Sequence, residues 1–254
     1  VFEKENDVSM GTTRANSAIV HAGYDPEPGT AMARLNVRGS ALTKEQCAAF
    51  DVKYRQIGSL VLAFSDEEMA TVRRLYENGV ANGVPGVRVL TREETLAMEP
   101  NLSDAVCGAL YAPSAAIVEP WDLALALAEA AVENGVELHL ETAVTGAEKI
   151  SGGWRLHTAK GDFEARAVVN AAGVEADLVA AMAGEPGFTT IPSRGEYYLL
   201  DKSQGYVVNH VVFQCPNRDG KGVLVSPTVH YNLIVGPNAE PSGREDVSTQ
   251  ADAL

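Results

Sequence analysis

The chain has 254 residues, of which 46% are hydrophobic and 21% are charged, and its formal net charge is −14. This composition predicts a globular protein with a buried core, in one large domain or two modest ones. So acidic a chain is not expected to bind nucleic acid or an anionic membrane surface. A small anionic substrate stays compatible with it, because a pocket can be locally positive.

No apolar run approaches the roughly 18 residues that a membrane-spanning helix requires, and the mostly charged residues 3–7 do not resemble a signal peptide. We therefore expect a cytoplasmic protein, at most peripheral to a membrane. Cys47, Cys107 and Cys215 are far apart and form no CxxC pair. This spacing predicts free thiols and no metal site. Because the chain opens on Val1, we expect truncation at both ends.

The first part of the chain contains two expected strands around a long helix. Residues 1–2 read as the end of a buried strand, and residues 57–64 as another strand. Residues 29–50 repeat apolar side chains at helical spacing. Together they indicate alternating strands and helices.

Two capping boxes predict where the next helices begin. Ser65 is followed three residues later by Glu68, and Thr91 by Glu94. In this motif the hydroxyl accepts from a free amide of the first turn while the acid reaches back. The second helix is expected to end at Pro100.

The clearest predicted helix covers residues 120–134, with Pro120 at its first turn and Gly135 after its end. A second short helix is expected from about residue 174 to residue 182. The strands expected after residue 135 are 136–140, 143–150, 154–158, 162–165, 167–170, 196–200, 207–213, 222–225 and 233–235. This order indicates an α/β fold with a β-rich final part.

Glu3 is the first candidate binding residue. An acid that closes a buried strand is where a dinucleotide-binding fold places its ribose ligand. A solvated charge at a strand end is the alternative.

The stretch from Gly11 to Gly23 is rich in small and hydroxylated residues, including Thr12, Thr13, Asn16 and Ser17. Such residues let the backbone approach a phosphate or an aromatic ring closely. His21 lies near the end of this stretch. Taken alone, it is a candidate base or a core histidine.

A third stretch, residues 168–173, runs from two valines into Asn170, two alanines and Gly173. These small residues predict either close approach to a ligand or tight packing between a strand and a helix.

Taken in order, these segments resemble the FAD-dependent oxidoreductase family of the D-amino-acid oxidase type, which includes glycerol-3-phosphate dehydrogenase and L-2-hydroxyglutarate dehydrogenase. The resemblance covers nearly the whole chain and implies FAD as the cofactor. It implies a ribose contact for Glu3, an adenine contact for the strand around Val144, and a position beside the flavin ring for His21. The cofactor-binding residues that it implies are Glu3, Thr12, Thr13, Asn16, Ser17, Ala143, Val144, Ala172 and Gly173.

Two further segments resemble the L-2-hydroxyglutarate dehydrogenase branch, namely residues 192–198, which contain Arg194-Gly195-Glu196-Tyr197, and residues 235–239. Tyr231 departs from the branch, because relatives carry glycine there. The family's glycine loop would precede Val1 and its glycine-rich flavin segment would follow Leu254. We therefore expect this chain by itself to bind FAD weakly.

The resemblance implies a discontinuous, Rossmann-like FAD-binding domain formed by residues 1–53 and 115–187. It implies a substrate domain, a mostly antiparallel sheet with flanking helices, formed by residues 54–114 and 188–254. The expected reaction is hydride transfer from a small anionic hydroxylated metabolite to the flavin. His21 would accept the hydroxyl proton, and Arg194 would bind the carboxylate or phosphate.

Three matters stay open at this point. One alternative is an amine oxidase of the same fold, which the histidine-containing loop disfavours. Another is a non-catalytic fragment or a scaffold for an electron-transfer partner. The electron acceptor itself, such as a quinone or a flavoprotein subunit, is not indicated by the sequence.

Overall fold

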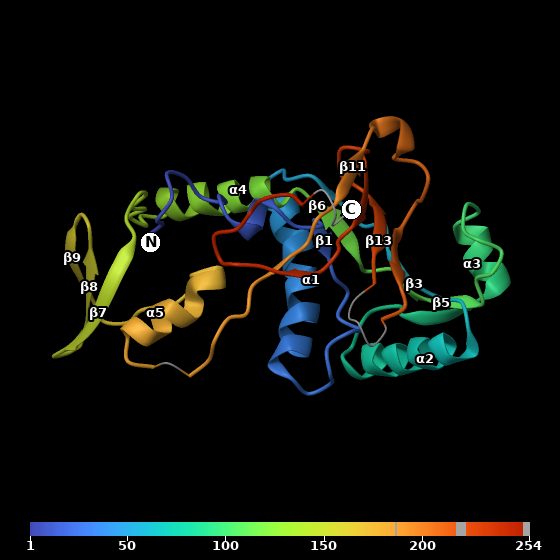
Figure 1. Ribbon diagram of the computed structural model, residues 1–254, viewed down its shortest axis with the longest axis horizontal. Helices are drawn as coiled ribbons and strands as arrows, with labels where there is room; N and C mark the ends of the chain where they lie inside the picture. Colours follow the sequence, from blue (N-terminus) through green and yellow to red (C-terminus); the bar gives the residue numbers. More distant parts are fainter. Residues whose placement is uncertain (186, 217–221, 251–254) are drawn as a thin grey trace. The chain divides into compact units, whose positions relative to one another are not determined.

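The computed structural model describes residues 1–185, 187–216 and 222–250, and these residues fall into two compact units (Figure 1). The first unit comprises Val1–Asn16, Ala124–Arg194 and Ala239–Gln250. The second comprises Ser17–Leu123 and Gly195–Asn238. Each unit is therefore built from separate stretches of the chain.

The boundaries between the compact units lie at different positions from the predicted domain boundaries. Residues 17–53 were assigned to the FAD-binding domain, but they cluster with the second unit. The cause is strand pairing, because β1 (Ile19–Val20) and β2 (Tyr54–Arg55) both pair with β6 (Ala116–Val118). Compactness does not test ligand binding, so the roles assigned to the domains stay predictions.

The second unit contains a seven-stranded sheet with the order β11-β14-β13-β12-β3-β5-β4. Its neighbouring strands are antiparallel except β12 and β3, which are parallel. The bounds are β3 Ser59–Ala63, β4 Arg88–Thr91, β5 Gly108–Ala112, β11 Tyr198–Leu200, β12 Val211–Gln214, β13 Leu224–Pro227 and β14 Leu233–Gly236. The prediction of a mostly antiparallel sheet with flanking helices is confirmed.

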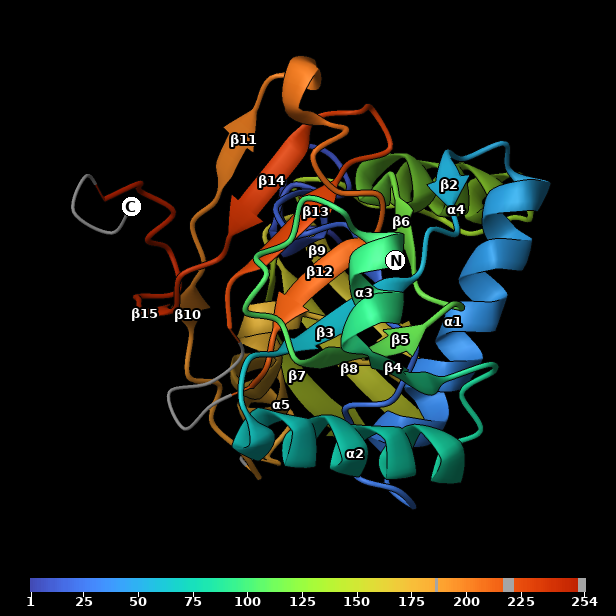
Figure 2. The same ribbon diagram turned by 90° about the vertical axis from the view of Figure 1, so that its right-hand side faces the viewer.

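Both faces of this sheet are covered near β3, all five residues of which are buried. On one face, Val61 packs with Leu75 of α2 (Asp66–Ala81). On the other face, Leu60 packs with Leu96 of α3 (Arg92–Met98). Figure 2 shows both helices beside the sheet. Burial on both faces explains why β3 reads as a continuous apolar run.

The short strands β1, β6 and β2 form a three-stranded antiparallel sheet in the same unit. Ile19 pairs with Ile117, and Ile117 pairs with Arg55. Ile117 also packs with Val211 of β12. This small sheet is therefore fixed against the large one, and His21 follows directly after β1.

The helix starts follow the predicted caps with one difference. Thr91 and Glu94 form the full capping box, with Glu94 N donating to Thr91 Oγ1 at 3.2 Å and Thr91 N donating to Glu94 Oε2 at 2.8 Å. Ser65 Oγ accepts from Glu68 N at 3.2 Å, but the Glu68 carboxylate accepts from Phe64 N instead of Ser65 N. The long helix α1 is confirmed at Ala31–Ala49.

The first unit contains the predicted meander, a sheet of β7 (Val144–Ile150), β8 (Gly153–Thr158) and β9 (Gly161–Ala165). Helix α4 (Pro120–Glu133) belongs to the second unit up to Leu123 and to the first unit from Ala124. It begins at the predicted proline, and Gly135 follows it with a φ of +87°. The remaining elements are η1 Thr12–Arg14, η2 Gly173–Glu175, α5 Ala176–Met182, η3 Lys202–Gln204, β10 Ser193–Arg194 and β15 Glu240–Pro241.

Three predicted strands are wrong in this unit. Residues 136–140 and 167–170 form no strand, and Val169 is 89% exposed. At the N-terminus only Phe2 pairs, in a parallel bridge with His139, and Val1 is exposed. His139 N donates to Val1 O and Glu3 N donates to His139 O, each at 2.9 Å, so residues 1–3 and 139 pair only over this bridge. Residues 167–170 pair with no described strand, and a strand needs a partner to satisfy its backbone groups.

The described helices include none that is both long enough and apolar enough to cross a lipid bilayer.

Candidate active site

Three of the predicted cofactor-binding segments meet in the first unit. Thr142 N donates to the carbonyl oxygen of Glu3 at 2.8 Å, which places Ala143 and Val144 directly after that contact. Lys4 Nζ donates to Glu175 Oε1 at 2.8 Å, in the 3₁₀ turn that begins at Gly173. The N-terminal residues are thus hydrogen-bonded to two segments that lie more than 130 residues later in the sequence. Lys4 and Glu175, for example, are 171 residues apart.

Glu3 itself is half-buried, and its Oε1 accepts from Glu5 N at 2.9 Å. The turn after residue 170 is shaped by Asn170, which donates to Ala176 O at 2.7 Å and accepts from Ala172 N at 3.2 Å. Ala172 and Gly173 are exposed, and a Cβ at Gly173 would meet nothing within 4 Å. The small residues therefore border open space rather than a tight strand–helix contact.

The hydroxylated residues Thr12 and Thr13 lie in η1, and both are exposed. The side-chain amide of Asn16 donates to Thr12 O at 3.0 Å and to Thr13 O at 2.8 Å. Asn16 therefore fixes the local turn, while the two threonine side chains face outward and are accessible to a ligand.

His21 lies in the second unit, directly after β1. It is exposed, and its ring stacks on Phe213 of β12 with ring centroids 5.8 Å apart and planes at 25°. The alternative of a core histidine is wrong, because a core residue would be buried. Ser17 lies two residues before β1 and is half-buried.

Arg194 belongs to the first unit and is largely buried, with 14% of its side chain exposed. Its Nη1 donates to Asp246 Oδ2 at 2.9 Å and to Ser248 Oγ at 3.4 Å. The Arg194 guanidinium is thus neutralised by a carboxylate of the same unit. Its role as a substrate ligand stays a prediction, and a substrate anion would have to compete with Asp246.

A buried acid that the sequence interpretation missed lies beside the same small sheet as His21. Glu119 is 6% exposed, and its carboxylate is 3.0 Å from His230 Nε2 and 3.4 Å from Lys53 Nζ. Burial alone would raise the pKa of Glu119, but the hydrogen bond and charge of His230, with the charge of Lys53, lower it below its ordinary value. The His230 ring also stacks on Trp121. Glu119 directly precedes α4. An acid at the start of a helix is the sequence feature that could have identified it as a candidate, because a carboxylate there interacts favourably with the helix dipole.

A second buried acid was also missed. Glu99 is 0% exposed, and its Oε1 accepts from His210 N and His210 Nδ1, each at 2.7 Å, and from Asn209 N at 2.8 Å. This carboxylate satisfies backbone amides just before β12, the strand that carries Phe213. Nothing in the local sequence around Glu99 indicates a partner 111 residues away.

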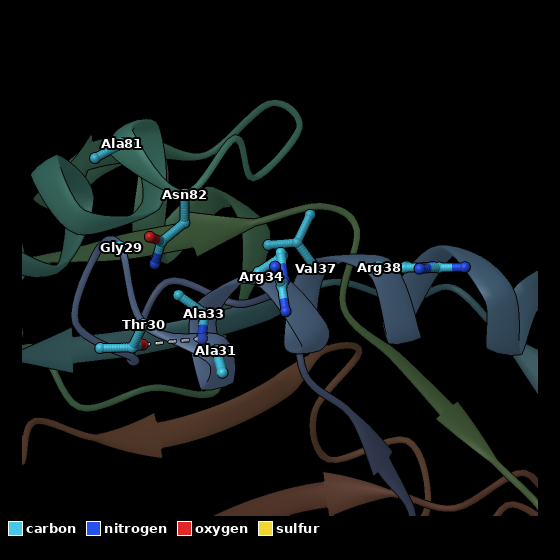
Figure 3. A pocket seen from close by; sticks show the side chains of 9 residues that line it. All are labelled: Gly29, Thr30, Ala31, Ala33, Arg34, Val37, Arg38, Ala81 and Asn82. Atoms are coloured by element: carbon cyan, nitrogen blue, oxygen red, sulfur yellow. Dashed lines mark hydrogen bonds between the residues drawn. The ribbon is translucent and has the colours of Figure 1, made fainter.

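The second unit also has a hollow of about 580 Å³ between the start of α1 and the end of α2. Figure 3 shows that Thr30 caps α1 there, with its hydroxyl accepting from Ala33 N at 3.2 Å. The lining residues are Gly29, Thr30, Ala31, Ala33, Arg34, Val37, Arg38, Ala81 and Asn82. None of the predicted site residues is among them. Within the described ranges, no three His, Cys, Asp or Glu side chains are grouped to hold a metal ion.

Comparisons with known proteins agree with the family resemblance. The sequence matches the family described as FAD dependent oxidoreductase over residues 1–254. It is 50% identical over 240 residues to a glycerol 3-phosphate dehydrogenase of Caloramator mitchellensis, and 32% identical over 243 residues to the L-2-hydroxyglutarate dehydrogenase of Escherichia coli K12. These matches cover 94% of this chain, but only 50% and 57% of the two relatives.

Solved structures of the same kind superpose closely. The reduced L-alpha-glycerophosphate oxidase of Mycoplasma pneumoniae with FAD bound gives a TM-score of 0.90 at 29% identity, over 99% of this chain and 68% of that one. Glycine oxidase from Geobacillus kaustophilus gives a TM-score of 0.84, also at 29% identity, over 99% of this chain and 67% of that one. The chain spans about half the length of the first curated relative it matches. With a family match that runs from its first residue to its last, this chain belongs to the FAD dependent oxidoreductase family.

Proposed function

We propose that the protein containing this chain is an FAD-dependent dehydrogenase or oxidase that oxidises a small anionic metabolite at a hydroxyl-bearing carbon. The observation that carries the proposal is the exposed His21 at the end of β1, stacked on Phe213. The substrate class is supported by the relative at 50% identity, which is a glycerol 3-phosphate dehydrogenase. L-2-hydroxyglutarate is the second candidate substrate, supported by the relative at 32% identity.

The donor set of the first unit fits FAD. The Glu3 carboxylate is a suitable acceptor for ribose hydroxyls, and the exposed hydroxyls of Thr12 and Thr13 are available to the cofactor. The open turn at Ala172 and Gly173 leaves room for close approach of a ligand. Asn16, Ser17, Ala143 and Val144 complete the proposed cofactor-binding residues. When bound, FAD accepts the hydride that leaves the carbinol carbon.

In this proposal His21 takes the hydroxyl proton of the substrate. Histidine is the side chain best suited to accept a proton near neutral pH. The Phe213 ring restricts the rotation of the imidazole, so that the base is held in a defined direction before the substrate arrives. Arg194 is the proposed ligand of the substrate carboxylate or phosphate, in exchange for Asp246.

Anaerobic reduction of the flavin in the full-length protein tests this function. Glycerol 3-phosphate, L-2-hydroxyglutarate, uncharged glycerol and a set of amino acids are each mixed with the oxidised enzyme, and the loss of flavin absorbance is followed. Fast reduction by one anionic hydroxylated compound, with slow reduction by glycerol, is expected. Reduction by amino acids alone would assign the amine-oxidising alternative instead. Re-oxidation by oxygen, a quinone or a flavoprotein then identifies the acceptor.

A further inference from the structure

The segment that follows His21 is held by the side chain of one asparagine. Asn82 caps the end of α2, and its side-chain amide donates to Gly23 O at 2.9 Å and to Pro26 O at 2.8 Å. Figure 3 shows this side chain at the end of α2, directed toward the chain that precedes α1. Both hydrogens of the amide are used, so one side chain fixes two carbonyl groups of this segment. All of these residues belong to the second unit.

Two glycines allow the same segment to pack closely against α1 and α2. Gly23 has a φ of +105°, and a Cβ there would lie 2.6 Å from Val37 Cγ2. Gly79 lies within α2, and a Cβ there would lie 3.1 Å from Tyr24 Cβ. A larger residue at Gly23 would therefore need a strained backbone and would displace Val37. Glycine inside a helix is destabilising relative to alanine, and the close contact with Tyr24 accounts for Gly79.

The residues directly before and after His21 are fixed as well. Val20, before it, pairs with Ala116 of β6. Ala22, after it, is 1% exposed and packs in the core cluster that also contains Tyr24. The backbone of His21 can therefore move only if β1 or the segment held by the asparagine moves with it.

The ring of His21 has a contact that leaves this backbone position important. The imidazole is exposed and stacks on Phe213, with ring centroids 5.8 Å apart. Stacking holds the orientation of a ring but lets it slide parallel to its neighbour. Where the imidazole lies along the Phe213 ring therefore depends on the position of the backbone at residue 21.

From these contacts we infer that Asn82 is a positioning residue for His21. Its amide fixes the segment after His21, and the backbone fixed in this way places the imidazole for proton transfer. A general base must lie within hydrogen-bond reach of the substrate hydroxyl, so a displacement of about 1 Å is enough to slow the reaction. The inference rests on the proposed function, because the role of His21 as the base belongs to that proposal.

Nuclear magnetic resonance of the His21 ring tests the placement without substrate. In the full-length oxidised flavoprotein, with its histidines isotopically labelled, the His21 signals are identified by their loss in His21→Gln. The ring current of Phe213 shifts these signals, and Phe213→Leu gives their position without it. Asn82→Ala should move the His21 signals toward that position. Asn101→Ala is the matched control, because Asn101 also holds a carbonyl of the second unit, Val207 O at 2.9 Å. It should leave the His21 signals in place.

Anaerobic flavin reduction at saturating substrate tests the consequence for catalysis. Asn82→Ala should slow the limiting rate by about 5- to 50-fold, which is less than the loss on removing the base itself. The dissociation constant for the substrate should stay unchanged. In a His21→Gln background the same substitution should have no further effect, because no base is left to position. A role of Asn82 in stability alone would not give this result.

Three results in the folded Asn82→Ala enzyme would each overturn the inference: unmoved His21 signals, a wild-type rate, or an equal slowing in the His21→Gln background. If Asn82→Ala does not fold, Asn82→Ser replaces it in both measurements, because a hydroxyl keeps one donor, and the same results decide.

The two measurements also separate this inference from the proposed function. Moved His21 signals in an enzyme that no hydroxylated compound reduces would contradict the proposed reaction and keep Asn82 as the residue that places His21. Fast reduction of the wild type by a hydroxylated compound, together with unmoved signals in Asn82→Ala, would contradict the inference alone.

Discussion

The two units of the chain are stabilised by different interactions. In the second unit, fully buried apolar residues such as Leu60, Leu75 and Leu110 fill both faces of the large sheet. Among the described residues, Leu156 is the single buried apolar side chain of the first unit. That unit instead contains ion pairs between distant residues, among them Lys4 with Glu175 and Arg244 with Asp177. The candidate base His21 therefore lies in the unit that contains nearly all of the buried apolar side chains. Most of the proposed FAD-binding residues lie in the unit that has few of them.

This contrast predicts a division of effects between the units. Substitutions in the second unit should change the rate of chemistry or the global stability. Substitutions in the first unit should change cofactor affinity, or a local unfolding step with its own pH dependence. Each unit has its own tryptophan, Trp121 in the second and Trp154 in the first. Single-tryptophan variants can therefore report on each unit separately.

The largest effect is expected at His21. Replacing His21 with Gln in the full-length enzyme should slow anaerobic flavin reduction by about 10²–10⁴, the usual contribution of a general base. FAD affinity and the stability of the second unit should hardly change, because the side chain is exposed. Reduction should rise with pH through one ionisation in the wild type and lose that dependence in the variant.

Stopped-flow absorbance measures this, with His157→Gln in the first unit as the control. A folded His21→Gln enzyme that reduces within about threefold of wild type would remove His21 as the base.

The next effect tests the core of the second unit. Leu110 is 0% exposed, so Leu110→Ala should reduce the free energy of unfolding by about 2–5 kcal/mol through lost burial and a residual cavity. Leu178→Ala in the first unit removes the same side chain from a position that is 46% exposed, and about 0.5 kcal/mol or less is expected there. Urea unfolding followed by Trp121 fluorescence in a Trp154→Phe background measures the effect at Leu110, and Trp154 fluorescence in a Trp121→Phe background measures the effect at Leu178. Equal losses at the two leucines would mean that the units do not differ in this way.

A smaller effect is expected at Glu3, in the first unit. If its carboxylate accepts from the ribose hydroxyls, Glu3→Ala leaves polar groups of the ligand unpaired, at a cost of about 1–3 kcal/mol. FAD affinity should fall by roughly 5- to 150-fold, whereas the unfolding of the second unit should stay unchanged. Fluorescence titration of the apoprotein with FAD measures the affinity, and Glu5→Ala is the control because Glu5 is exposed. An unaltered affinity would leave Glu3 as a solvated charge.

The sequence predicted the parts of this structure that depend on near neighbours. The capping box of Thr91 and Glu94 spans three residues, and the β7–β8–β9 meander is built from adjacent hairpins. Strand pairing between distant segments was not predictable, and the parallel pair of β12 with β3 joins Val211 to Ser59. For the same reason the apolar residues 167–170 were wrongly predicted as a buried strand. Local pattern indicates a strand, but only a pairing partner makes one.

The candidate site shows the same limit. The order of Glu3, His21 and Gly173 along the chain was sufficient to indicate the family, which the full-length match confirms. The side-chain partners were not predictable, because Glu119 meets His230 across 111 residues and Arg194 meets Asp246 across 52. Tyr231 is an informative exception. The sequence comparison expected glycine there, and the structure places Tyr231 at a φ of +67°, a conformation that favours glycine.

The smallest effect concerns the pH dependence of the first unit. Asp177 accepts a bidentate pair of bonds from Arg244, at 2.8 Å and 2.6 Å, and one from Thr190 N at 2.9 Å. Chiefly through the bond from Arg244, these contacts lower the pKa of Asp177 from 3.8 to about 2. A carboxyl group with a lowered pKa in the folded state stabilises that state fully above its unfolded pKa. Its contribution is lost as the pH falls through the folded value. The first unit should therefore weaken between about pH 4 and pH 2.

Asp177→Asn should remove that part of the pH dependence and weaken the first unit at neutral pH as well. Unfolding followed by Trp154 fluorescence in a Trp121→Phe background measures it at each pH. Asp104→Asn in the second unit is the control, since the Asp104 side chain is 97% exposed. If the Asp177→Asn protein keeps the acid sensitivity of the wild type in the Trp154 signal, the Arg244–Asp177 pair is not what holds residues 239–250 to α5. The stability of the first unit would then have to come from its few apolar contacts, such as the stacking of Phe2 on His139.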